Sequence, residues 1–147
     1  MSKAVAFEAT LHVRDTCLCL HTQRAARALA RRFDEALRPA GLTNEQFSLL
    51  MALNRPQPAT IGALAALLGA DRTTLTAALK PLVRRRLAEI NVNPADRRAR
   101  CIILTEAGHA CLASALPLWT EAHEALESSL KGGSAPVLRR GLVALST

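Results

Sequence analysis

The chain has 147 residues, of which half are hydrophobic and only 3% aromatic, and its formal net charge is +7. That length suits one domain or two closely joined halves. Because aromatic residues are few and tyrosine is absent, the core must be built from aliphatic side chains. No apolar run approaches the ~20 residues of a membrane span, and Glu8 interrupts the stretch that a signal peptide would need. The four cysteines are too few and too unevenly spaced for a secreted disulfide framework, so we expect reduced thiols and a cytoplasmic protein.

The positive charge is concentrated in about one fifth of the chain. Residues 71–100 contain eight of the 19 Lys and Arg residues but only three of the 12 Asp and Glu residues, a net charge of +5. A local basic segment of this kind is a stronger indication of nucleic-acid binding than a uniformly high isoelectric point.

The first predicted helix covers residues 15–37. Apolar residues recur there at helical spacing on one face, and arginines mark another face. Asp34 and Arg38 have the spacing of a supportive i,i+4 ion pair. Pro39 and Gly41 should end the helix, because proline and glycine are the strongest local breakers.

Two shorter helices are expected next. Thr43 and Gln46 form a capping-box signature for the first of them, which should stop before the proline-containing loop at residues 55–58. Thr60 can cap the second, and Gly69 should end it. Both helices carry leucines at helical spacing, which indicates that they pack on a common core.

A further helix follows after a turn of only a few residues. Asp71 is its expected N-cap, and residues 72–80 form its first part. A helix, a short turn containing glycine and a second helix have the spacing of a helix-turn-helix. Pro81 should distort the second helix locally, because proline lacks an N–H and crowds the carbonyl four residues earlier.

The pattern then changes to strand. Residues 87–92 alternate as a strand, residues 101–104 form a second short run, and residues 93–98 supply a basic turn between them. A long helix is expected from residue 105 to about residue 130, and a last short helix from 136 to 145. A helix-turn-helix followed by a basic hairpin is the layout of a winged helix, whose second helix fits the major groove.

Several short segments resemble the MarR family of bacterial transcription regulators. They are Gly41–Thr43, Asp71–Thr76, Asp96–Arg98 and Leu104–Gly108. The resemblance implies a mainly α fold with a small β-hairpin wing, in which a winged helix-turn-helix lobe is combined with N- and C-terminal dimerisation helices. The implied regions are 1–40 for N-terminal dimerisation, 41–105 for the DNA-binding lobe and 106–147 for C-terminal dimerisation.

The resemblance also implies a function. We expect a regulator, in most cases a repressor, that binds double-stranded DNA as a homodimer on a near-palindromic operator. Half-sites of helix-turn-helix dimers lie about one DNA turn apart, roughly 34–36 Å. In this family Arg98 would be the wing arginine that enters the minor groove, and Asp96 would orient it. A small-molecule effector or an oxidant would release the DNA.

The expected DNA contacts come from the basic segment. Arg72 can bind the O6 and N7 atoms of guanine, and threonine hydroxyls suit bases or phosphates. The other cations are expected to neutralise phosphates. The complete set of expected contact residues is Arg72, Thr73, Thr74, Thr76, Lys80, Arg84, Arg97, Arg98 and Arg100, with Arg85 as a further phosphate candidate.

Two positions depart from the family pattern. Arg86 stands where the family usually has glycine in a left-handed conformation, so either the backbone is strained by about 1 kcal/mol or the turn is built differently. Ala77 stands where many members have arginine, so a DNA contact is expected to be missing there.

The cysteines raise an alternative signal. Cys19 lies where a peroxide-sensing branch of the family has its reactive thiol, and oxidation there would displace the DNA-binding lobes. That branch activates its thiol through tyrosines, which this chain lacks. Cys17 should point away from Cys19 if both belong to one helix, and Cys111 could pair with either.

Other classes have weaker support. Neither a glycine-rich phosphate loop nor a nucleophile elbow is present, so we expect no enzyme activity and no cofactor. The four histidines make no dense ligand motif, so no metal site is expected. A basic helical module that binds RNA or an acidic protein is the remaining alternative, although stacking aromatics are missing from the basic segment.

Overall fold

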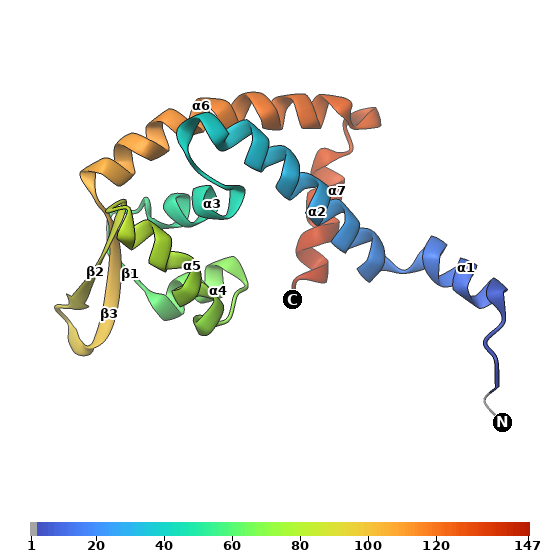
Figure 1. Ribbon diagram of the computed structural model, residues 1–147, viewed down its shortest axis with the longest axis horizontal. Helices are drawn as coiled ribbons and strands as arrows, with labels where there is room; N and C mark the ends of the chain where they lie inside the picture. Colours follow the sequence, from blue (N-terminus) through green and yellow to red (C-terminus); the bar gives the residue numbers. More distant parts are fainter. Residues whose placement is uncertain (1–2) are drawn as a thin grey trace.

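A computed structural model describes residues 3–147, so residues 1 and 2 of the expected N-terminal region 1–40 lie outside the described part. It confirms a mainly α fold with a small antiparallel sheet (Figure 1). The elements are α1 (Phe7–Thr16), α2 (Leu18–Leu37), η1 (Arg38–Ala40), α3 (Asn44–Leu53), β1 (Ala59–Thr60), α4 (Ile61–Leu68), α5 (Arg72–Arg84), β2 (Ala88–Asn93), β3 (Asp96–Leu104), α6 (Glu106–Ser129), η2 (Lys131–Gly133) and α7 (Ala135–Leu145).

The N-terminal helix differs from the expected one. A single helix from residue 15 is wrong, because Cys17 adopts an extended conformation (φ −66°, ψ 110°) that separates α1 from α2. Its sulfur accepts a hydrogen bond from the N–H of Leu20, so Cys17 caps α2. Helix α1 has no buried residue and extends beyond the rest of the molecule (Figure 1).

The link from α2 to α3 follows the expected breakers. Gly41 is left-handed at φ 71°, and the capping box of Thr43 and Gln46 is present. The expected pair of Asp34 and Arg38 is wrong. Asp34 instead accepts hydrogen bonds from the backbone N–H (2.7 Å) and side-chain amide (2.8 Å) of Asn44, which tie the end of α2 to the start of α3.

The core is built from aliphatic side chains, as the composition requires. Leucines from α2, α3, α4, α5 and α6 form one buried cluster together with Ile102 of the sheet. Trp119 of α6 stacks on Phe47 (centroids 6.0 Å apart) and on His123 (4.6 Å) at the edge of this cluster. Trp119 therefore serves packing within the chain.

The sheet is larger than expected by one strand. Strand β3 lies between β1 and β2 in the order β1-β3-β2, and it pairs antiparallel with both. β1 is only two residues long and gives no sequence signal, since Ala59 and Thr60 are too few to show an alternation. β3 begins at Asp96, so the turn at the tip of the hairpin is reduced to Pro94 and Ala95.

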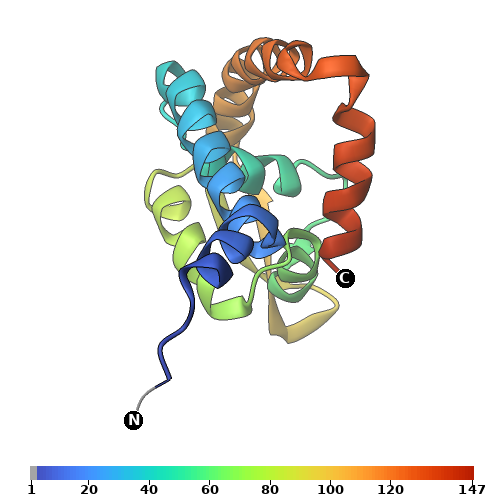
Figure 2. The ribbon, with the colours of Figure 1, turned by 90° about the vertical axis from the view of Figure 1, so that its right-hand side faces the viewer.

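Three helices flank the winged-helix lobe, and two of them, α2 and α6, contribute Leu37 and Leu112 to its core. α2 and α6 run above the lobe, and α7 descends beside it at a distance from the lobe's helices (Figures 1 and 2). α6 continues through Pro117 to Ser129, and Gly132 and Gly133, both with positive φ, turn the chain into α7. Among the described residues, no helix combines the length and apolarity needed to cross a membrane.

Candidate nucleic-acid interface

The helix-turn-helix is formed by α4 and α5. Thr60 accepts from the N–H of Ala63, and Asp71 accepts from the N–H of Thr74, so both helices have the N-caps expected from sequence. Gly69 ends α4 at φ 64°, a conformation that costs little only for glycine. These three local signals set the short turn that places α5 against α4.

Helix α5 has one buried and one exposed face. Leu75, Leu79 and Leu82 are at most 2% exposed and attach the helix to the core. At 100° per residue, the opposite face carries the exposed side chains of Thr73, Ala77, Lys80 and Arg84, with Thr76 at its edge. Arg72, in the first turn, is also exposed but lies nearer to the buried side. This polar and basic face has the dimensions and chemistry of a helix that enters a major groove. Ala77 leaves it without a hydrogen-bonding group at that position.

The three threonines are not equivalent. Thr74 lies beside the basic face, where its hydroxyl donates to Asp71 (2.8 Å), and Thr76 donates to the carbonyl of Arg72 (2.7 Å). Thr73 makes no hydrogen bond through its hydroxyl within the described residues. Thr73 can therefore donate or accept without losing a bond, whereas Thr74 and Thr76 offer mainly their oxygen lone pairs.

Arg72 lies back over the start of α4. A Cβ added at Gly62 would come within 2.8 Å of its Nη2 atom, so the guanidinium occupies space that any side chain at Gly62 would fill. The side chain is flexible and exposed, so it can swing outward toward a ligand. This use of Gly62 was not predicted, because a single glycine within an Ala- and Leu-rich helix gives no specific signal.

Helix α5 continues through Pro81 to Arg84, although proline leaves the carbonyl of Ala77 without its usual helical partner. Beyond it, Arg85 donates to the carbonyl of Gly41 (2.9 Å) and so connects the end of α5 to the turn before α3. This bond gives Arg85 a structural use that its expected role as a phosphate candidate does not include.

The backbone at Arg86 decides between the two alternatives given above, a strained left-handed arginine and a turn built differently. It is the one non-glycine residue with positive φ in the described chain, at 59°, so the turn is built as glycine would build it. The conformation is held by hydrogen bonds from its N–H to Val83 and from Leu87 to Leu82 (3.0 and 2.9 Å). A left-handed arginine costs the folded state roughly 1–2 kcal/mol.

The wing is formed by β2 and β3. Its tip is ordered by two side chains: Asn93 accepts from the N–H of Ala95, and Asp96 accepts from the N–H of Arg98 (both 3.0 Å). The pairing of β2 with β3 is irregular near the tip, because Val92 pairs with Arg100 but Asn93 pairs with Asp96, which leaves residues 97–99 outside the regular register. Arg97, Arg98 and Arg100 are all exposed.

The cations of α5 and the wing lack acidic partners. None of the ion pairs between described residues involves Lys80, Arg84 or the arginines at 72, 97, 98 and 100. The nearest acid on α5, Asp71, is engaged as a cap, and its hydrogen bonds from the backbone and hydroxyl of Thr74 lower its pKa. The surface therefore presents uncompensated positive charge, which favours a polyanionic ligand.

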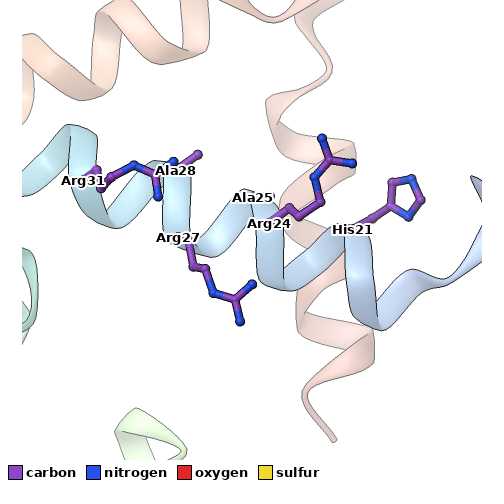
Figure 3. A pocket seen from close by; sticks show the side chains of 6 residues that line it. All are labelled: His21, Arg24, Ala25, Arg27, Ala28 and Arg31. Carbon is purple, nitrogen blue, oxygen red and sulfur yellow. The ribbon is translucent and has the colours of Figure 1, made fainter. Parts of the chain in front are cut away.

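A second basic feature lies along α2. A hollow of about 520 Å³ is lined by His21, Arg24, Ala25, Arg27, Ala28 and Arg31. Arg24 and Arg27 both line this hollow, and their side chains diverge from each other, Arg24 upward and Arg27 downward in the view (Figure 3). The arginine face of this helix is expected from the sequence, but no role for it follows from the sequence alone.

The cysteines are all free within the described chain. Cys19 is exposed, and its sulfur accepts from the amide of Gln23 (3.5 Å) rather than from His21 or Arg24. Cys111 is half-buried and directs its thiol at the carbonyl of Ala40. Cys17 caps α2 from outside the helix, so Cys17 and Cys19 do not belong to one helix as expected. Residues 3–147 contain no cluster of three or more potential metal ligands.

Comparison with known proteins decides the family. A MarR family model matches residues 40–99, which contain the helix-turn-helix and most of the wing. The crystal structure of the Mycobacterium tuberculosis transcriptional regulator MosR in complex with DNA is 40% identical, covers 89% of this chain and 94% of that chain, and has a TM-score of 0.81. The chain belongs to the MarR family of DNA-binding transcription regulators.

Two further MarR-family relatives agree with this. An E. coli MarR mutant complexed with operator DNA is 25% identical, covers 92% of this chain and 97% of that chain, and has a TM-score of 0.81. The transcriptional repressor NicR of Pseudomonas putida is 32% identical over 92 residues, which are 63% of this chain and 58% of NicR. These relatives are transcription regulators rather than enzymes, as expected for this chain.

Proposed function

We propose that this MarR-family protein is a transcriptional repressor that binds a near-palindromic operator as a homodimer. The observation that carries the proposal is the exposed face of α5 together with the arginines of the wing, which have no acidic partners among the described residues. A regulator of this kind acts where the chromosomal DNA lies, in the cytoplasm.

The proposed contacts divide into base reading and phosphate binding. Arg72, after swinging away from Gly62, reads a guanine in the major groove, and Thr73 supplies a free hydroxyl beside it. Thr74 and Thr76 offer oxygen lone pairs at the edge of this contact. Phosphates are neutralised by Lys80, Arg84, Arg97 and Arg100. Each of these four contacts contributes a similar amount to the slope of log affinity against log salt.

The wing adds a contact in the adjacent minor groove. Arg98 enters the groove. Asp96 positions Arg98 by accepting a hydrogen bond from the backbone N–H of Arg98, not from its guanidinium. An arginine in a narrow minor groove is attracted by the enhanced negative potential there.

Exposed apolar surface supports the homodimer. Val137 and Leu145 of α7 are 62% and 57% exposed, and Leu138 and Leu142 on the same side of the helix are also exposed. A contiguous apolar helix face of this kind marks an interaction site, and a second copy presents the matching face under two-fold symmetry. Two lobes related in this way read half-sites about 34–36 Å apart.

The release signal in this proposal is a small anionic molecule. The hollow along α2 supports it, because three arginines and a histidine line it without an acidic partner among the described residues. In a screen of small carboxylates, each added separately to the protein–DNA complex, we expect at least one to release the DNA. Arg24→Ala should then weaken release without changing DNA affinity in the absence of the carboxylate.

A thiol signal is the second candidate, and the exposure of Cys19 in the first turn of α2 favours it. Peroxide should release DNA from the wild type, and Cys19→Ser should abolish that release. Parallel Cys17→Ser and Cys111→Ser variants identify the resolving thiol. An unchanged wild type under peroxide removes this candidate.

The test of the proposal is Arg98→Ala. It should weaken operator binding by about 1–3 kcal/mol, the usual range for a specific contact, while sedimentation still reports a dimer. Arg55→Ala, in the exposed loop after α3, is the matched control and should bind as the wild type does. Dissociation of the Arg98→Ala dimer, or unchanged DNA affinity, contradicts the assignment of the wing.

A further inference from the structure

Thr105 and Gly108 belong to the motif that resembles the MarR family, yet neither lies on the proposed DNA-binding face. Thr105 is the N-cap of α6, where its hydroxyl oxygen accepts from the N–H of Gly108 (3.0 Å). The same hydroxyl donates to the carbonyl of Arg86 (2.6 Å), in the turn after α5. One hydroxyl thus joins the start of α6 to the end of the helix-turn-helix.

Two backbone contacts reinforce this connection. The N–H of Thr105 donates to the carbonyl of Leu87 (3.1 Å). The same carbonyl lies against Gly108, where an added Cβ would come within 2.0 Å of the oxygen. No side chain fits at that distance, so glycine at 108 is required for the close approach of α6 to Leu87. We name Arg86, Leu87, Thr105 and Gly108 the α5–α6 joint.

The joint lies where both ends of the wing meet. β2 begins immediately after Leu87, and β3 ends immediately before Thr105. The carbonyl that accepts from Thr105 belongs to the left-handed Arg86, so the strained residue is part of the same contact. The recognition helix and the wing are therefore fixed to the first turn of α6.

We infer that Thr105 and Gly108 are positioning residues that set the orientation of the DNA-reading lobe relative to α6, and through α6 the spacing of the two lobes in the dimer. The inference rests on the proposed function, because spacing has meaning only for a dimer on paired half-sites. A loosened joint leaves each lobe able to bind its half-site but removes the discrimination between half-site spacings.

The test compares Thr105→Val with Thr43→Val. Both lose an N-cap hydroxyl, but only Thr105 also donates to another element. The probe is a duplex that the wild type selects from random sequence, together with versions in which one base pair is inserted or removed between the half-sites. Thr105→Val should reduce the preference of the wild type for the selected spacing at least about fivefold, whereas Thr43→Val and Thr105→Ser should retain it.

The outcomes separate the two proposals. A wild type that selects no sequence contradicts the proposed function, whereas an unchanged spacing preference in Thr105→Val overturns the joint alone. Amide hydrogen exchange in the wild type gives an answer even if Thr105→Val does not fold. The Thr105 amide should exchange at least about tenfold more slowly than that of Arg97 near the wing tip, and equal rates overturn the inference.

Discussion

Replacing Arg86 with glycine should stabilise the protein. The left-handed backbone costs arginine roughly 1–2 kcal/mol in the folded state. Glycine removes that strain but gains about 0.5–1 kcal/mol of conformational freedom in the unfolded state. The Arg86 side chain is exposed and makes no hydrogen bond within the described residues, so little else is lost. The net gain should be about 0.5–1 kcal/mol in the free energy of unfolding.

The assay is chemical unfolding followed by circular dichroism, at one protein concentration because dimers gain stability with concentration. Arg84→Gly is the matched control. Arg84 is the last residue of α5 and keeps a helical conformation, so glycine there should cost up to about 1 kcal/mol. Arg86→Ala should remain within about 0.5 kcal/mol of the wild type, because alanine keeps the strain. If Arg86→Gly loses as much stability as Arg84→Gly, the argument from backbone strain is refuted.

Three further predictions concern single side chains. Arg72→Ala should cost about 1–3 kcal/mol of operator affinity and relax the preference at one base pair, as measured by binding to single-base operator variants. Lys80→Ala should reduce the slope of log affinity against log salt by about one, equally on specific and nonspecific duplexes; an unchanged slope rules out the phosphate contact. The hydrogen bonds from Asn44 lower the pKa of Asp34, so its contribution to stability is present above its unfolded value of about 3.9 and is lost as pH falls through its lower folded value. The stability difference between wild type and Asp34→Asn should therefore close on acidification below about pH 4, and a difference that widens there contradicts this.

Local signals were sufficient to predict most of the fold. Thr43, Thr60 and Asp71 cap the expected helices because a short polar side chain at a helix start serves its own backbone and needs no distant partner. Gly41 and Gly69 end their elements for an equally local reason, the ease with which glycine adopts a left-handed conformation. The wing followed from strand alternation on either side of a turn-forming segment.

The wrong predictions concern positions where contacts between residues far apart in sequence decide which local structure or partner forms. Nothing in the sequence distinguishes Arg38 from Asn44 as the partner of Asp34, because that choice depends on how α3 folds back on α2. Cys17 separates α1 from α2, although cysteine is a weak helix breaker. The apolar residues near Cys17 therefore show one continuous helical period in the sequence. Two-residue β1 exists only through its pairing with β3.

The candidate site shows the same division. The exposure of the basic residues on α5 and the wing follows from the helix and strand periods, so these residues could be predicted one by one. The position of Arg72 over Gly62 and the bond of Arg85 to Gly41 could not, because each depends on the packing of two elements that are separate in sequence.

The central claim is sequence-specific binding of duplex DNA by this lobe. It is tested most directly by measuring the affinity of the wild-type protein for the intergenic DNA upstream of its own gene and for a scrambled duplex of equal composition, at about 0.15 M salt. The account predicts binding at least about 10³-fold tighter to the upstream DNA. Equal affinity for the two duplexes contradicts it.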